Sequence, residues 1–264
     1  MMETTSANPV RRALLACSPT VGTWMQVGHP AVAEVLSGVG FDWIAADCEH
    51  TDMGPAEFVA MARGMHGRGA VPLVRVREND TLAIRQMLDM GAQGVIVPLV
   101  NTAEEARRAV SAAKYPPAGV RGFAFHRAND WGQRFSEYAA TANEDVAVIV
   151  MIESRQAVEN IDQILAVEGV DGVFIGPYDM SGSYGMPGRT SDPVVTAACQ
   201  TVADACRNAG KAAGLHIVLP DEQAIARAVE KGFSFLAVGV DTIFLEQAAA
   251  KSLSCLRAAL SRMS

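Results

Sequence analysis

Side chains that could do chemistry together gather at four short apolar runs of this sequence. The first run leads into Asp47-Cys48-Glu49-His50, and the second carries Arg75 and Arg77. The third ends at Glu153, and the fourth leads into Gly176-Pro177-Tyr178-Asp179. If these runs are parallel strands of one barrel, their carboxyl ends meet at one rim. Carboxylates, an imidazole and a guanidinium would then share one site.

Glu153 and Asp179 are the candidate metal ligands. Glu153 follows the apolar run Val146–Ile152, where a carboxylate without a partner would be costly to bury. Two hard oxygen ligands with open positions suit Mg²⁺, Mn²⁺ or a similar ion such as Co²⁺, held partly by water and substrate. Either carboxylate could instead cap the following helix or pair with Arg75.

Arg75 and His50 are the candidates for stabilising charge and moving a proton. A guanidinium that is always charged suits a developing oxyanion better than a titrating lysine does. His50 lies in a polar segment, where an acid–base residue is more plausible than a core residue. Arg75 could also form a structural salt bridge to Glu49 or Glu153, which is compatible with a catalytic role.

The positions of the lysines and of the other histidines limit which reaction mechanisms are possible. His126 lies in a long loop and could reach substrate, whereas His216 falls within an expected strand and is expected to be packed. The lysines all fall in loops or at helix ends: Lys114, Lys211, Lys231 and Lys251. A Schiff-base nucleophile therefore has no candidate, and chemistry on a carbonyl substrate would need a metal as its electron sink.

Eight short apolar runs alternate with helical patterns along the chain and are the expected strands. They are Gly22–Val27, Asp42–Asp47, Val71–Val76, Gly94–Leu99, Val146–Glu153, Gly172–Gly176, Ala213–Val218 and Phe235–Val240. This alternation predicts consecutive βα units and a parallel sheet covered on both faces. Eight units favour a (β/α)8 TIM barrel, a single α/β domain over residues 1–264, although an open doubly wound sheet has the same pattern.

One long irregular segment, Lys114–Phe135, is rich in proline and glycine. A loop of this length is usually a lid or a binding segment. We therefore expect it to contribute to the site.

Composition excludes several classes of protein. The 264 residues include 22 basic and 29 acidic side chains, giving a net charge of −7. Without a basic block, nucleic acid and anionic membranes are poor partners. The apolar stretch Ala13–Cys17 is too short for a signal peptide, and the five cysteines contain no CxxC pair. We therefore expect a soluble cytoplasmic protein.

An ordered set of motifs along nearly the whole chain resembles the HpcH/HpaI aldolase family. The motifs are Gly22-Thr-Trp24, Phe41-Asp-Trp43, Asp47-Cys-Glu-His50, Leu73-Val-Arg75, Val97-Pro98-Leu99, Tyr115-Pro-Pro-Ala-Gly-Val-Arg-Gly122, Glu153, Val170-Asp-Gly-Val-Phe-Ile-Gly-Pro177 and Ala237-Val-Gly-Val-Asp241. Each motif alone is unspecific, but the ordered set is specific. The resemblance implies a metal-dependent class II pyruvate aldolase, which is a carbon–carbon lyase.

The resemblance also implies a role for each site residue. Glu153 and Asp179 correspond to the metal carboxylates of the family and His50 to its base. Arg75 corresponds to the arginine that stabilises the enolate. Asp89 corresponds to the aspartate that orients and polarises the histidine, although from the sequence alone it would be assigned to a solvated helix end.

Substrate contacts follow from the same resemblance. The backbone N–H groups of Tyr178 and Asp179 would hold the pyruvyl carboxylate, next to Gly176 and Pro177. The family usually has a glutamine that contacts substrate where this chain has Met151, and methionine cannot donate that hydrogen bond. This departure bears on which substrate is used rather than on the type of reaction.

The implied reaction is reversible cleavage of a 4-hydroxy-2-oxo acid to pyruvate and an aldehyde, through an enolate held by the metal and Arg75. Such enzymes serve in aromatic compound catabolism. Two alternatives stay open: an oxaloacetate decarboxylase or related enolate-forming lyase, and a metabolite-binding barrel without catalysis. The resemblance also implies a homo-oligomer, trimer or hexamer, in which the segment Thr242–Leu260 could pack on a neighbouring subunit.

Overall fold

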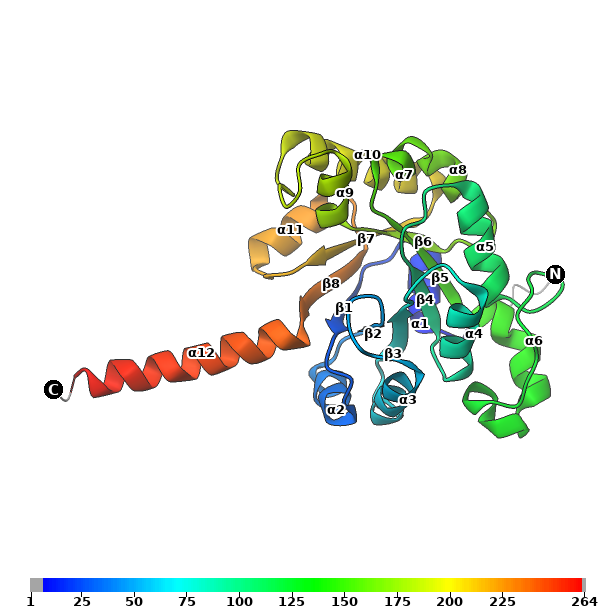
Figure 1. Ribbon diagram of the computed structural model, residues 1–264, viewed down its shortest axis with the longest axis horizontal. Coiled ribbons are helices and arrows are strands. Elements are labelled where there is room, and N and C mark those ends of the chain that lie inside the picture. The colour runs from blue at the N-terminus through cyan, green and yellow to red at the C-terminus, as the bar shows by residue number, and fades with distance from the viewer. Residues whose placement is uncertain (1–6, 263–264) are drawn as a thin grey trace.

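Eight parallel strands form a closed barrel in the computed structural model, which describes residues 7–262 (Figure 1). The strands are β1 (Thr20–Met25), β2 (Trp43–Asp47), β3 (Val71–Arg75), β4 (Gly94–Val97), β5 (Ala147–Ile152), β6 (Gly172–Ile175), β7 (Ala212–Ile217) and β8 (Phe235–Val240). Each predicted strand overlaps one of these. Because β8 pairs with β1, the sheet is closed and the predicted (β/α)8 barrel is confirmed over the open alternative. Residues 1–6 and 263–264 of the predicted domain lie outside the described residues.

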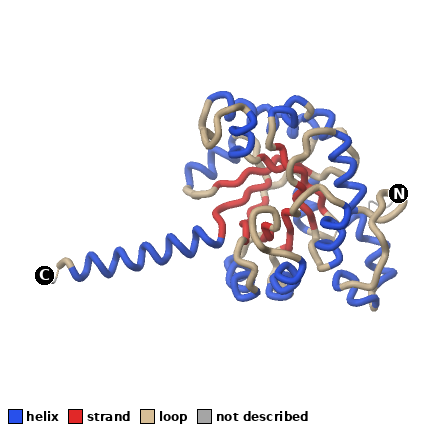
Figure 2. Tube along the Cα trace, in the orientation of Figure 1, coloured by secondary structure: helices blue, strands red, loops and turns tan. Residues whose placement is uncertain are grey.

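Helices connect successive strands around the barrel, whereas α1 precedes β1 and α12 follows β8 (Figure 2). They are α1 (Pro9–Leu15), α2 (Pro30–Val39), α3 (Pro55–Gly64), α4 (Thr81–Asp89), α5 (Ala103–Ala113), the 3₁₀ helix η1 (Arg127–Gly132), α6 (Phe135–Asp145), α7 (Arg155–Glu159), α8 (Ile161–Leu165), α9 (Pro177–Ser183), α10 (Pro193–Ala209), α11 (Glu222–Glu230) and α12 (Asp241–Leu260). Asp80 caps α4, and Thr102 with Glu105 forms a capping box at α5.

Inward-facing side chains from the strands fill the barrel below the carboxyl-end rim. Trp43 stacks on Phe235 with ring centroids 4.4 Å apart, and Phe174 meets Phe235 edge to face. Val10 and Leu14 of α1 belong to the same buried cluster and extend it beyond the strands. This packed interior supports the rim on which the candidate residues lie.

A glycine in β1 makes room for the central tryptophan. A Cβ added at Gly22 would lie 2.1 Å from Cδ2 of Trp43, which is fully buried. We expect Gly22→Ala to lower the free energy of unfolding by about 1–3 kcal/mol, because the indole ring has to shift within a close-packed interior. Urea unfolding measures this change. The control is Gly38→Ala in α2, where a Cβ meets nothing within 4 Å; equal losses in the two variants would contradict the packing argument.

The segment Thr242–Leu260 lies in the helix α12, which projects away from the barrel (Figures 1 and 2). Its large apolar side chains Leu245, Leu253, Leu256 and Leu260 are exposed. No helix within residues 7–262 is both long and apolar enough to cross a membrane.

The long segment Lys114–Phe135 does not form a lid over the carboxyl-end rim within this chain. It connects α5 to η1 and α6, ahead of β5, and therefore lies toward the amino ends of the strands. An aromatic contact helps to order it: the buried ring of Tyr115 stacks on the exposed ring of Phe123, with centroids 4.4 Å apart. The expectation of a lid was wrong for a single chain, because the length of a loop does not show at which end of the barrel it lies.

Candidate active site

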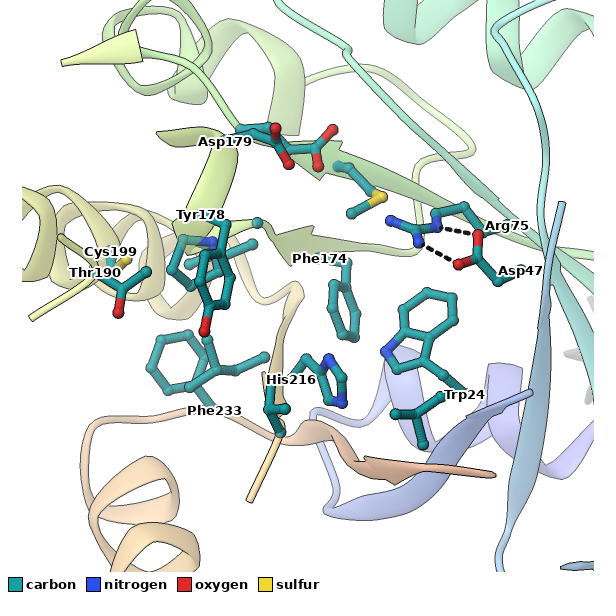
Figure 3. Close-up of a pocket in the computed structure, with 18 of the residues that line it drawn as sticks. Trp24, Asp47, Arg75, Phe174, Tyr178, Asp179, Thr190, Cys199, His216 and Phe233 are labelled. Carbon is teal, nitrogen blue, oxygen red and sulfur yellow. Dashed lines mark hydrogen bonds and ion pairs between the residues drawn. The ribbon is translucent and has the colours of Figure 1, made fainter. Parts of the chain in front are cut away.

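A cavity of about 430 Å³ opens at the carboxyl ends of the strands (Figure 3). Arg75, Glu153 and Asp179 all line it, as the sequence predicted. The predicted substrate-binding residues Met151, Gly176, Pro177 and Tyr178 line the same cavity. Side chains from separate strands and from the first turn of α9 thus meet at one site.

Arg75 is held in place by two carboxylates and an aromatic ring. Its Nε donates to Oδ1 of Asp47 at 3.0 Å, and its Nη2 lies 2.8 Å from Oδ2 of the same carboxylate. Its Nη1 lies 3.1 Å from Oε2 of Glu49, so the salt bridge to Glu49 considered from the sequence is present. The guanidinium carbon lies 4.8 Å from the ring centroid of Trp24. These contacts fix the direction in which the guanidinium faces the cavity (Figure 3).

Asp47 is the partner of Arg75 that the sequence analysis did not single out. Its side chain is 1% exposed. Burial alone would raise its pKa, but the hydrogen bond and charge of Arg75 hold the pKa of Asp47 below its ordinary value. Asp47 and Arg75 are directly opposite one another in the pairing of β2 with β3, which is the signal that could have identified the pair.

Glu153 is a buried carboxylate without a cationic partner among the described residues. Its Oε2 accepts a hydrogen bond from the backbone N–H of Leu99 at 3.0 Å. Leu99 has a φ of +54°, in the left-handed region that residues other than glycine seldom adopt. Burial raises the pKa of Glu153 to about 7. The Leu99 N–H acts against this shift, and the nearby charges of Glu49 and Asp179 add to it.

The neighbouring negative charges of Glu153 and Asp179 fit a divalent cation. Asp179 lies in the first turn of α9, close enough for its charge to act on Glu153. Gly176 keeps the space beside Glu153 open, since a Cβ there would lie 2.6 Å from Oε1. Within residues 7–262 no group of three or more His, Cys, Asp and Glu side chains is arranged to hold a metal. Glu153 and Asp179 would therefore hold an ion together with water and substrate.

His50 lies beside this site rather than in the cavity wall. Its side chain is 57% exposed, and its Nε2 lies 3.5 Å from Oε2 of Glu49. Glu49 also contacts Arg75, so one carboxylate connects the candidate base to the candidate oxyanion donor.

Asp89 is not brought to His50 within one chain. It ends α4, which runs from the carboxyl end of β3 back toward the amino end of β4. There Asp89 Oδ1 accepts from Nη2 of Arg121 at 2.8 Å and lies 3.2 Å from Nε2 of His126. The expected pairing of Asp89 with His50 is therefore not present within a single chain. His126 is also buried at this end of the barrel, and the expectation that it reaches substrate is not met in one chain.

His216, which was expected to be packed, instead lines the cavity. Its ring lies edge-on to Trp24 with centroids 6.2 Å apart, and its Nε2 lies 2.9 Å from the carbonyl oxygen of Gly239. The signal that could have found it is the two-residue alternation of a strand. Ala212 belongs to the barrel interior and a Cβ at Gly214 would touch Phe174, so position 216 faces inward nearest the rim.

The cavity also has a polar far end that the sequence analysis missed. Thr190, Thr196, Gln200 and Lys231 line it beyond Tyr178. Lys231 follows the last turn of α11, as expected for a lysine at a helix end, yet it reaches this cavity. The far end can hold part of a substrate larger than pyruvate.

Known proteins resemble this chain in sequence and in fold. The model of the HpcH/HpaI aldolase/citrate lyase family matches residues 20–248. A "4-hydroxy-2-oxo-heptane-1,7-dioate aldolase" of Shigella sonnei (strain Ss046) is 43% identical over 244 residues, which is 92% of each chain. The same figures hold for its Escherichia coli namesake.

Solved structures agree with the sequence comparisons. An HpcH/HpaI aldolase/citrate lyase family protein from Burkholderia cenocepacia J2315 has a TM-score of 0.91 at 32% identity, covering 95% of this chain and 100% of that one. The HpcH/HpaI aldolase from Desulfitobacterium hafniense DCB-2 has a TM-score of 0.86 at 31% identity, covering 94% and 96%. This chain belongs to the HpcH/HpaI aldolase/citrate lyase family.

Proposed function

We propose that this protein is a divalent-metal-dependent aldolase that reversibly cleaves a 4-hydroxy-2-oxo acid to pyruvate and an aldehyde. The observation that carries the proposal is the buried carboxylate of Glu153, which has no cationic partner among the described residues and shares one cavity with Asp179 and the fixed guanidinium of Arg75. The names of the 43% identical relatives support the same reaction class.

Glu153 and Asp179 would hold the ion, whether Mg²⁺, Mn²⁺ or Co²⁺. When bound, it supplies Lewis-acid polarisation of the 2-oxo group. The backbone N–H groups of Tyr178 and Asp179 lie in the first turn of α9, where N–H groups have no partner within the helix. They would receive the substrate carboxylate.

Arg75 stabilises the negative charge that develops on the 2-oxo oxygen as the C3–C4 bond breaks. Asp47 and Glu49 hold its guanidinium in place before reaction. Donors that need no reorientation during the reaction stabilise a transition state more than mobile ones do.

His50, directly or through water, accepts the proton of the C4 hydroxyl. Loss of this proton lets the C4 oxygen become the carbonyl of the departing aldehyde, and the enolate then takes up a proton at C3 to give pyruvate. We expect His50→Ala to lower kcat for cleavage by about 10²-fold, the low end for a general base, since solvent reaches this exposed site. Pyruvate release measured with lactate dehydrogenase tests this, and His66→Ala at the other end of the barrel is the matched control.

The relatives' name suggests the first substrate to test. Cleavage of 4-hydroxy-2-oxoheptane-1,7-dioate between C3 and C4 gives pyruvate and 4-oxobutanoate. With Mg²⁺, Mn²⁺ or Co²⁺ present, we expect both products in equal amounts, and none after chelation. Absence of cleavage with every metal, together with no exchange of pyruvate methyl protons in D₂O, would favour a metabolite-binding barrel without catalysis.

Oxaloacetate decarboxylation is the second candidate, since it forms the same enolate. It is favoured by the position of His50 outside the cavity wall, because loss of CO₂ requires no deprotonation of a C4 hydroxyl. If both activities are present, His50→Ala should impair aldol cleavage and spare decarboxylation. A variant that loses both equally would contradict the assignment of His50 as the base.

A homo-oligomer, trimer or hexamer, is part of the proposal. The exposed leucines of α12 support it, because a helix that projects from its own barrel leaves them without cover. A role for Asp89 toward His50 would also require a second copy of the chain. Light scattering on the full chain measures the mass; a monomer would contradict this part of the proposal.

A further inference from the structure

We infer that His216 selects aldehydes that carry a hydroxyl group, by accepting a hydrogen bond from that hydroxyl through Nδ1. The inference rests on the proposed aldolase function and names its class of acceptor substrate. Three features of the structure carry it: the position of the ring, its fixed tautomer and the absence of a hydrogen-bond donor to Nδ1 among residues 7–262.

The ring of His216 forms part of the cavity wall near the reacting groups. It lies edge-on to Trp24, which also contacts the guanidinium of Arg75 (Figure 3). Phe174 lies on the same side of the cavity, and Trp24 and Phe174 meet edge to face with centroids 5.4 Å apart. The imidazole is therefore a polar group set in an aromatic wall.

A bulge in β8 fixes the tautomer of this imidazole. The β1–β8 register advances two residues from Gly22 to Trp24 but three from Ala237 to Val240, so β8 has an extra residue. Gly239 has a φ of +61°, and its carbonyl oxygen accepts from Nε2 of His216 at 2.9 Å. Because a carbonyl oxygen only accepts, Nε2 must carry the proton and Nδ1 must present a lone pair.

Burial favours the neutral imidazole. It lowers the pKa of His216 to about 4, although the hydrogen bond to the Gly239 carbonyl acts in the opposite direction; the charge of Arg75 lowers the pKa more than the charge of Asp47 raises it. A neutral ring with Nε2 engaged has one remaining function, which is acceptance at Nδ1. Within residues 7–262 no hydrogen bond is made to this atom.

The chemistry of the substrate shows which group can use this acceptor. The pyruvyl half offers only acceptors, namely a carboxylate and a carbonyl oxygen, and neither can donate to Nδ1. The C4 hydroxyl gives its proton to the base in the proposed reaction. A hydroxyl elsewhere on the aldehyde half, as in a 2-hydroxyaldehyde, is then the donor that fits. An aldehyde without one leaves Nδ1 unpaired in an aromatic wall, which is costly.

The test compares two aldehydes of equal size in the full-length enzyme with Mn²⁺ and saturating pyruvate. Glycolaldehyde carries the hydroxyl and propanal has a methyl group in its place. We expect His216→Leu to lower kcat/KM for glycolaldehyde by roughly 10- to 100-fold while propanal changes by less than about 3-fold. The intrinsic difference in aldehyde reactivity cancels, because each aldehyde is compared between variants.

His216→Asn is the conservative variant, since an amide can donate to the Gly239 carbonyl and still accept with its own oxygen. It should recover part of the preference for glycolaldehyde. Thermal unfolding of both variants checks the fold. Equal loss with both aldehydes, or no loss with either, would overturn the inference. A wild-type enzyme inactive with both aldehydes and with the dioate would instead overturn the proposed function.

Discussion

Replacing Glu153 with glutamine is expected to abolish divalent-metal binding and to lower kcat by at least about 10³-fold, since Lewis-acid stabilisation contributes several kcal/mol to a transition state. Glutamine keeps the shape and can still accept from the Leu99 N–H. It removes the charge that would bind the ion. Calorimetric titration with Mn²⁺ and pyruvate release measure the two effects.

The matched control is Glu104→Gln, which neutralises an exposed carboxylate on α5 that pairs with Arg107. It should bind metal and turn over as the wild type does. Tight Mn²⁺ binding in the Glu153 variant would contradict the assignment of this residue as a ligand.

The pH dependence of stability gives a second, independent readout of Glu153. Burial raises its pKa to about 7 in the metal-free protein, from 4.5 when unfolded. As the pH rises, the unfolded chain therefore releases this proton before the folded chain does. The stability that protonated Glu153 contributes is complete below about pH 4.5, and it is lost as the pH rises through about 7. Without metal, the wild type should lose more stability between pH 5 and pH 8 than Glu153→Gln does. Identical pH profiles in urea unfolding would show that the carboxylate is solvated or paired.

Much of the barrel could be predicted from the sequence, because strands covered on both faces are continuous apolar runs. The same reasoning placed Arg75, Glu153 and Asp179 at one rim, since their positions follow from where each strand ends. It could not place Asp89 or the segment Lys114–Phe135. Both lie at the amino ends of the strands, where nothing in the spacing shows what they contact.

His216 shows a second limit of sequence reasoning. It lies within a strand, and its apolar neighbours made it resemble a core position. Its exposure to the cavity depends on the register of β7 with β8 and on the bulge at Gly239, which no local pattern revealed. Side chains at the ends of strands are easier to assign than those that reach the site from within a strand.

Replacing Arg75 with methionine is expected to lower kcat/KM by about 10²- to 10³-fold, the effect of removing a fixed oxyanion donor. It should also lower the free energy of unfolding by about 3–5 kcal/mol, because Asp47 is then left buried without its cation. The side chain of Asp47 is only 1% exposed. Steady-state kinetics and urea unfolding report the two losses separately.

The double variant Asp47→Asn/Arg75→Met distinguishes the structural role of Arg75 from its catalytic one. It removes the unpaired carboxylate, so most of the lost stability should return, since replacing both members of a buried pair is far less costly than breaking it. Activity should stay low, because no guanidinium faces the cavity. If activity returned together with stability, Arg75 would be needed only to neutralise Asp47, and charge on the enolate oxygen would have to be stabilised by other groups in the cavity.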